Sequence, residues 1–165
     1  MPPAEADCLY FGGGYPELYA EKLSANASML ESVRAAHARG VPIFAECGGF
    51  LYLNRLLDGY AMAGVLHGES VNKHKPVRFG YVELQANEDC LIAKKGARLR
   101  GHEFHYYDCT ENGEAFTARR KGSQYRCAAA GKTIAAGFAH VHFYSNLECA
   151  ATFYENCLEA KKCRK

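Results

Sequence analysis

The chain has 165 residues, of which 48% are hydrophobic, and a formal net charge of +2. This length predicts one domain or a fragment of one, with enough apolar residues for a core. Acidic and basic residues are interspersed, so we expect no nucleic-acid surface. No apolar run reaches the roughly 18 residues that a membrane-spanning helix needs, so we expect no membrane span.

The eight cysteines are scattered, and none forms a C-x-x-C pair. Structural zinc sites use such paired spacing, so the pattern predicts no metal site. We interpret most of these thiols as small core or surface residues in a reducing compartment. No secretory signal pattern stands before the first apolar strand, and we therefore expect a cytoplasmic protein.

An apolar strand is predicted over residues 7–11, and it runs directly into Gly12, Gly13 and Gly14. Glycines after a strand leave backbone N–H groups free to face a ligand, although the same run is also typical of a flexible turn. Helical spacing follows over residues 16–39, with a break expected near residues 24–26. Gly40 is expected as the residue just past the helix end.

The next stretch has the layout of a nucleophile elbow, with cysteine in place of serine. Residues 41–45 predict a buried strand, Cys47 stands at the turn beside Gly48 and Gly49, and residues 50–57 have helical spacing. We expect the helix N-terminus to favour the thiolate of Cys47, which is the form that attacks. The alternative is a buried structural cysteine.

Strands alternating with helices over residues 7–57 predict an α/β fold with a parallel sheet. Further strands are expected at residues 77–84, 102–107, 115–120, 124–128 and 133–139, and a helix from Asn146. We expect those between 77 and 128 to be mostly antiparallel, as an extension of the main sheet or as a second one. Ligands bind such folds at the carboxyl ends of the parallel strands, where the glycine run and Cys47 both lie.

A cysteine nucleophile needs a base within hydrogen-bond reach, and seven histidines are available. His140 and His142 follow a predicted strand, so they can share a rim with Cys47. Their spacing does not indicate which of the two histidines is the better candidate for the base. A metal site formed with His102 and His105 is an alternative that the spacing does not demand, and each histidine could also be structural.

Five stretches carry a resemblance to a known family, and they occur in order along nearly the whole chain. They are residues 12–18 (GGGYPEL), 45–53 (AECGGFLYL), 79–81 (FGY), 100–106 (RGHEFHY) and 140–143 (HVHF). Together they closely resemble the C-terminal glutaminase domain of the cobyrinic acid a,c-diamide synthase family. The resemblance implies the flavodoxin-like fold of class I, or triad, glutamine amidotransferases, in which a mostly parallel sheet is flanked by helices.

The resemblance also implies a chemistry for the site. Cys47 would attack the side-chain amide of glutamine, and His140 would activate it. Backbone N–H groups of Gly13 or Gly14 and of Gly48 would bind the oxyanion. The ammonia would amidate the a and c carboxylates of a corrinoid substrate in cobalamin biosynthesis.

Two departures from the family pattern bear on these expectations. Many class I relatives carry a glutamate two residues after the histidine, where this chain has His142, so a Cys–His dyad is expected. Residues 1–165 would form a glutaminase domain that lacks its first strand and helix, and a synthetase domain would precede it. ATP and Mg²⁺ would bind that synthetase domain, so no cofactor is expected here. The sequence leaves open whether the chain forms a homo-oligomer.

Glu103 and His105 belong to the fourth stretch, and we expect them to orient glutamine or to couple the two domains. The alternation of a strand puts them on one face and His102 on the other. Three alternatives to the cobyrinate enzyme are a nickel-sirohydrochlorin a,c-diamide synthase, a non-catalytic binding module of the same fold, and a cysteine hydrolase or peptidase.

Overall fold

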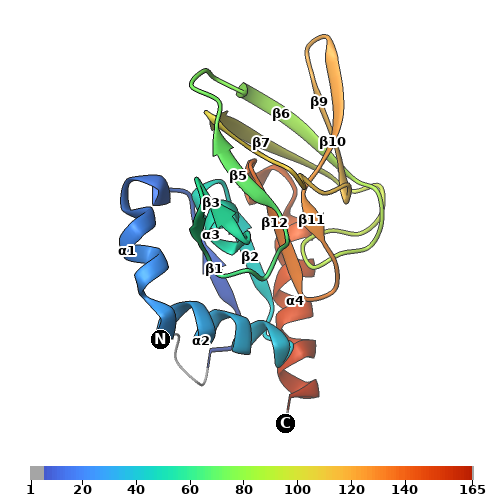
Figure 1. Ribbon diagram of the computed structural model, residues 1–165. Helices are drawn as coiled ribbons and strands as arrows, with labels where there is room; N and C mark the ends of the chain where they lie inside the picture. Colours follow the sequence, from blue (N-terminus) through green and yellow to red (C-terminus); the bar gives the residue numbers. More distant parts are fainter. Residues whose placement is uncertain (1–5, 165) are drawn as a thin grey trace.

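The computed structural model describes residues 6–164, and Figure 1 shows a central sheet with helices beside it and a second sheet beyond one end. The central sheet has the order β1-β2-β12-β11, in which β1, β2 and β12 are parallel and β11 is antiparallel. The strands are β1 (Leu9–Phe11), β2 (Ile43–Glu46), β11 (Ala129–Ala130) and β12 (Ile134–Gly137). The predicted α/β class is therefore confirmed.

Strand β2 connects two hydrophobic cores, because successive residues of a strand point to opposite faces. Ile43 and Ala45 lie in one core, together with buried residues of α2 (Ala27–Ala38). Phe44 lies in the other core, where its ring centroid is 5.7 Å from that of Phe153 on α4 (Leu147–Cys163). Helices therefore cover both faces of the sheet, as the parallel arrangement requires.

The helical segment after the glycines divides as predicted. A 3₁₀ turn, η1 (Pro16–Tyr19), leads into α1 (Ala20–Ala25), and α2 begins after Asn26. The Asn26 side chain accepts a hydrogen bond from the backbone N–H of Met29 at 3.3 Å, which caps α2. Gly40 has a φ of 76° just past the end of α2, in the conformation that glycine adopts most readily.

The helix after Cys47 is shorter than its apolar spacing predicts. Helix α3 (Gly48–Leu53) ends at Asn54, whose buried side chain donates to the carbonyl of Phe50 at 3.0 Å. Leu56–Leu57, predicted to be helical, instead form strand β3, because their backbone pairs with β5 (Glu69–Asn72). This correction places β3 in a small sheet of order β4-β3-β5-β8, with β4 (Tyr60–Ala61) and β8 (Tyr107–Cys109).

A five-stranded antiparallel sheet, of order β10-β9-β6-β7-β13, makes up the second layer. Its strands are β6 (Arg78–Ala86), β7 (Arg98–His105), β9 (Phe116–Arg120), β10 (Ser123–Cys127) and β13 (His140–His142). The antiparallel arrangement predicted for this region is confirmed. It forms a sheet of its own, and the 3₁₀ turn η2 (Phe143–Ser145) leads from it into α4.

The strand predicted over residues 133–139 is wrong at its end. Strand β12 stops at Gly137, and the chain crosses to the antiparallel sheet, where His140 pairs with His102 of β7. The crossing occurs at Phe138, whose ring stacks on His105 with centroids 3.8 Å apart and meets Phe50 edge-on at 5.0 Å. His140 therefore lies on a strand of the second sheet that reaches back over the first.

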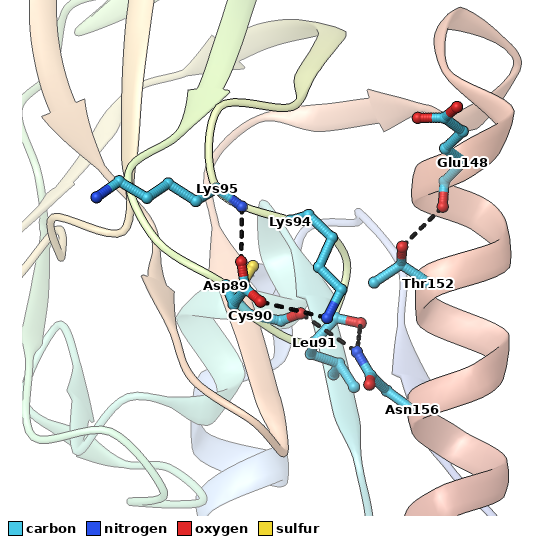
Figure 2. Close-up of polar contacts among 8 residues, drawn as sticks. All are labelled: Asp89, Cys90, Leu91, Lys94, Lys95, Glu148, Thr152 and Asn156. Atoms are coloured by element: carbon cyan, nitrogen blue, oxygen red, sulfur yellow. Dashed lines mark hydrogen bonds and ion pairs between the residues drawn. The ribbon is translucent and has the colours of Figure 1, made fainter.

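The connection between β6 and β7 is fastened to α4 (Figure 2). The Asn156 side chain donates to the carbonyls of Cys90 and Leu91 at 3.3 and 2.9 Å. Asp89 accepts from the backbone N–H of Lys95 and from Lys94. These bonds hold the connection against α4, outside the loop that follows β1 and the turn at Cys47.

Within residues 6–164, no helix is long and apolar enough to cross a membrane. All eight cysteines are free thiols, and the five in the interior are Cys90, Cys109, Cys127, Cys149 and Cys157.

Candidate active site

Cys47 stands at a sharp turn between β2 and α3, as the elbow pattern predicts. Its backbone has φ 48° and ψ −107°, a conformation that non-glycine residues rarely adopt and that costs on the order of 1–3 kcal/mol. The Cys47 N–H donates to the carbonyl of Gly137 at 2.8 Å, so the end of β12 holds the turn in place. The side chain is half-buried, at the carboxyl end of the central sheet.

The glycines on either side of the turn allow two backbones to meet. A Cβ on Gly48 would lie 2.5 Å from the carbonyl oxygen of Gly14, and a Cβ on Gly49 would overlap the carbonyl of Phe11. The Gly49 N–H donates to the carbonyl of Gly12 at 3.1 Å. Real Cβ atoms do not approach so closely, so both positions require glycine. The predicted meeting of the glycine loop with the elbow is thus present.

His140 lies against the glycine loop. A Cβ on Gly13 would overlap Cε1 of the imidazole and would lie 3.1 Å from Nδ1 and 3.3 Å from Nε2. Gly13 in turn precedes Gly14, which contacts Gly48 next to the sulfur. The structure therefore gathers Cys47, His140, Gly13, Gly14 and Gly48, which come from three distant stretches of the sequence, in one place.

The thiol of Cys47 is less acidic than its place at a helix N-terminus predicts. Burial raises the pKa of Cys47, while the backbone N–H of Gly48 acts in the opposite direction. The negative charges of Glu17, Glu46 and Glu103 raise that pKa further. The expectation of a favoured thiolate is therefore wrong for the unliganded protein.

Glu103 is buried on the inner face of β7, which it shares with His105, whereas His102 lies on the opposite face, as the strand alternation predicts. Only 2% of its surface is exposed, and the hydroxyl of Tyr125 donates to its carboxylate. Burial and this bond raise the pKa of Tyr125. The guanidinium of Arg78 lies 4.1 Å from the centre of the Tyr125 ring. The carboxylate is shielded from bulk solvent, and its charge raises the pKa of Cys47.

His105 lies two residues further along the same inner face. Its Nδ1 is 2.6 Å from the carbonyl of Tyr107, and since a carbonyl can only accept, Nδ1 carries the proton. Its Nε2 is buried and has no hydrogen-bond partner. Burial lowers the pKa of His105, so the ring is neutral at neutral pH. Nε2 is thus an unused acceptor behind Phe138, next to the crossing that leads to His140.

His142 points away from this group. It is exposed, and its ring contacts Tyr144 at a centroid distance of 6.0 Å. His102 lies on the outer face of β7, against Phe79 and Tyr81. Across residues 6–164, no three His, Cys, Asp or Glu side chains are placed to hold a metal ion. The alternative metal site built on His102, His105, His140 and His142 therefore has no support in the geometry.

Glu46 is a residue of the site that the sequence analysis passed over. It is 5% exposed and accepts two hydrogen bonds of 2.6 Å, one from the Tyr10 hydroxyl and one from the backbone N–H of Val141. Burial and Glu46 raise the pKa of Tyr10 to about 12. A charged residue at the end of an apolar strand, directly before Cys47, was a signal that could have identified it.

The fold and the elbow define a class of protein. The chain superposes on a crystal structure of a glutamine amidotransferase with a TM-score of 0.60 and 17% identity, over 93% of this chain and 78% of that one. A glutamine amidotransferase from Thermotoga maritima gives a TM-score of 0.55 at 15% identity, over 98% of this chain and 69% of that one. At these identities the likeness establishes the fold, which is that of the glutamine amidotransferases.

The sequence identifies the family within that class. Residues 2–147 match the CobB/CobQ-like glutamine amidotransferase domain, and the chain belongs to this family.

Relatives named cobyrinate a,c-diamide synthase agree with this assignment. The one from Caldanaerobacter subterraneus is 38% identical over 94% of this chain and 36% of its own length. That from Listeria monocytogenes is 42% identical over 87% of this chain and 34% of its own length. That from Salmonella typhimurium is 44% identical over 83% of this chain and 33% of its own length. The chain thus spans about a third of the length of these relatives.

The raised pKa of Cys47 leads to a testable pH dependence. Alkylation of Cys47 by iodoacetamide requires the thiolate, so its rate is expected to keep rising as the pH passes about 8.5, the usual value for a free cysteine. The measurement is the loss of unmodified Cys47 peptide by mass spectrometry, with the exposed Cys163 peptide from the same digest reporting reagent activity. A plateau already reached at neutral pH would contradict the direction of the shift.

Proposed function

We propose that this chain is the glutamine-hydrolysing part of an amidating enzyme, a cobyrinate a,c-diamide synthase. The observation that carries the proposal is that the His140 imidazole lies against Gly13, while the adjacent Gly14 contacts Gly48, the residue that follows Cys47 at the strained elbow. Family membership and the names of the relatives support it. A non-catalytic module of the same fold would have no need to keep nucleophile, base and glycine loop together.

The reaction begins with attack of the Cys47 sulfur on the side-chain carbonyl carbon of glutamine. Because the resting thiol has a raised pKa, its proton must leave as the S–C bond forms, and His140 accepts it. Collapse of the tetrahedral intermediate breaks the C–N bond, and His140 returns the proton to the departing nitrogen. Ammonia leaves, and a γ-glutamyl thioester stays on Cys47. Water then hydrolyses the thioester to glutamate and the free thiol.

The oxyanion of each tetrahedral intermediate needs hydrogen-bond donors that are already in place. The backbone N–H of Gly48 interacts with the sulfur, and the Gly13–Gly14 backbone lies against Gly48. We assign the oxyanion site to N–H groups of Gly48 and of Gly13 or Gly14. Glycine leaves these N–H groups open to a ligand, and a Cβ at Gly13 or Gly48 would meet His140 or Gly14.

The ammonia would amidate the a and c carboxylates of a corrinoid in an ATP- and Mg²⁺-dependent synthetase domain that acts as the partner of this chain. This part of the proposal rests on the relatives, which are about three times as long as the matched region. Their names favour cobyrinate over a nickel tetrapyrrole as the final acceptor. The cysteine chemistry of residues 6–164 is the same for either substrate.

The assignment of Cys47 is tested with 6-diazo-5-oxonorleucine, an electrophilic glutamine analogue. We expect it to label one of the eight cysteines, Cys47, and glutamine present in excess should slow the labelling. The site of modification is read by peptide mass spectrometry, with Cys47→Ala as the matched control. Labelling that persists unchanged in Cys47→Ala would show that another residue is the nucleophile.

Glu103 and His105 are proposed to orient glutamine rather than to attack it. The Glu103 carboxylate and Nε2 of His105 are both acceptors, both are buried on the inner face of β7, and Nε2 has no partner. The α-ammonium group of glutamine offers the complementary donors and charge. His142 is exposed and is assigned no contact with glutamine; we place it on the side that would face the synthetase domain.

Glu103→Gln tests this orienting role. Loss of the negative charge should raise KM for glutamine by roughly 10-fold, the loss expected from one charge-assisted hydrogen bond. Alkylation of Cys47 by iodoacetamide should be unchanged or slightly faster, since Glu103 raises the pKa of that thiol. Glu83→Gln is the control, because Glu83 lies on neighbouring β6 in an exposed ion pair with Arg98. Equal KM values in the two variants would contradict the proposal.

A further inference from the structure

Glu46 connects the three elements that form the candidate active site. Its carboxylate accepts from the Tyr10 hydroxyl on β1 and from the backbone N–H of Val141 on β13, each at 2.6 Å. Glu46 itself ends β2, directly before Cys47. The bond to Val141 reaches from the central sheet to a strand of the second sheet, and the carboxylate is 5% exposed, so water does not compete for either bond.

The two partners of Glu46 stand close to groups that must meet over the sulfur. Tyr10 lies two residues before Gly12, the start of the glycine loop, and its ring stacks on Phe44 with centroids 5.3 Å apart. Val141 follows His140, so the bond to its N–H fixes the backbone on which the imidazole is carried. The imidazole in turn lies against Gly13. One carboxylate thus sets the position of β13 relative to both the loop and the elbow.

Among the side chains of residues 6–164, Glu46 is the one that hydrogen-bonds the backbone directly after His140. The place two residues after it is occupied by His142, which is exposed and faces Tyr144. Side-chain hydrogen bonds to the imidazole of His140 are absent from the described part of the chain. The base is therefore held through its backbone and through its contact with Gly13.

The charge of Glu46 does not explain its presence beside the nucleophile. It raises the pKa of the Cys47 thiol, as do Glu17 and Glu103, and so disfavours the attacking form. The carboxylate of Glu46 hinders ionisation of Cys47, yet it is buried and both of its oxygens accept hydrogen bonds. Its presence is better explained by the two elements, β1 and β13, that these bonds hold. Breaking these bonds would leave buried polar groups unpaired.

We propose that Glu46 is a positioning residue that holds His140 and the glycine loop in register with Cys47. The proposal rests on the proposed glutaminase function and adds a part to it. Glu46 touches neither glutamine nor a transferred proton. It orients His140 through the backbone of β13, whereas a carboxylate next to the imidazole would orient the ring directly.

Three variants of the complete gene product separate geometry from charge. Glu46→Gln keeps an oxygen for the Val141 N–H and an amide for the Tyr10 oxygen, so kcat for glutamine hydrolysis should stay within about 5-fold of wild type. Glu46→Ala removes both bonds and should lower kcat about 100-fold, the loss typical of a catalytic group misplaced by 1 Å. Tyr10→Phe removes one bond and should lower kcat about 3- to 10-fold. KM should change less than about 3-fold in all three, since glutamine contacts are kept.

Asn156→Ala is the control for lost stability alone. Asn156 bonds the β6–β7 connection to α4 (Figure 2), and Asn156→Ala also removes the donor from two part-buried carbonyls. Its melting temperature should fall while kcat stays at the wild-type value. At an equal melting temperature, the kcat of Glu46→Ala should be far lower than that of Asn156→Ala. The reaction of Cys47 with 6-diazo-5-oxonorleucine should slow by a similar factor. Iodoacetamide should still alkylate the thiol.

The outcomes distinguish this proposal from the function on which it rests. Wild-type protein that neither hydrolyses glutamine nor reacts with the analogue at Cys47 would overturn the proposed function. If the wild-type protein is active and Glu46→Ala has the same kcat as Asn156→Ala, the positioning role alone would be overturned. If Glu46→Ala does not fold, Tyr10→Phe decides: wild-type kcat in that variant would equally overturn the role.

Discussion

The site depends on a close approach of two backbones at the elbow. Gly48 and Gly49 let the first turn of α3 lie directly on the loop that follows β1, and the contact of Gly48 with Gly14 is too tight for any side chain. This contact and the Cys47–Gly137 hydrogen bond together hold Cys47 at a positive φ. Strain of this kind persists only where the surroundings over-determine the conformation. The strained turn places Cys47 at the carboxyl end of the central sheet, next to Gly48, which contacts the glycine loop.

The remaining parts of the site are supported from outside the central sheet. His140 is carried on β13, which belongs to the antiparallel sheet, and the stacked ring of Phe138 and the carboxylate of Glu46 connect the two layers. Burial and the negative charges of Glu17, Glu46 and Glu103 raise the pKa of the Cys47 thiol, so the proposed attack on glutamine needs a group that removes its proton. Three strands therefore position the site: β2 leads into Cys47, β1 leads into the glycine loop, and β13 carries His140.

Local patterns predicted those parts of the structure that local sequence determines. Turn chemistry and strand alternation predicted the elbow at Cys47, the break before α2 and the shared face of Glu103 and His105, because each depends on neighbours along the chain. The resemblance selected His140 over His142, which spacing could not do. The missed features depend on tertiary contacts: β3 replaced the end of a predicted helix because β5 offers a partner, and β12 ended early because Phe138 enters a core. The raised pKa of Cys47 and the bonds of Glu46 arise from residues far apart in sequence, so no local pattern could reveal them.

The central claim is that the His140 imidazole must lie against Gly13, over the elbow, for glutamine to be hydrolysed. Comparing Gly13→Ala with Gly12→Ala tests it most directly, because a Cβ on Gly13 would overlap the imidazole whereas one on Gly12 meets nothing within 4 Å. We predict that Gly13→Ala lowers the rate of glutamine hydrolysis about 100-fold while Gly12→Ala stays within about 3-fold of wild type, at equal melting temperatures. Equal activity of the two variants would contradict the account.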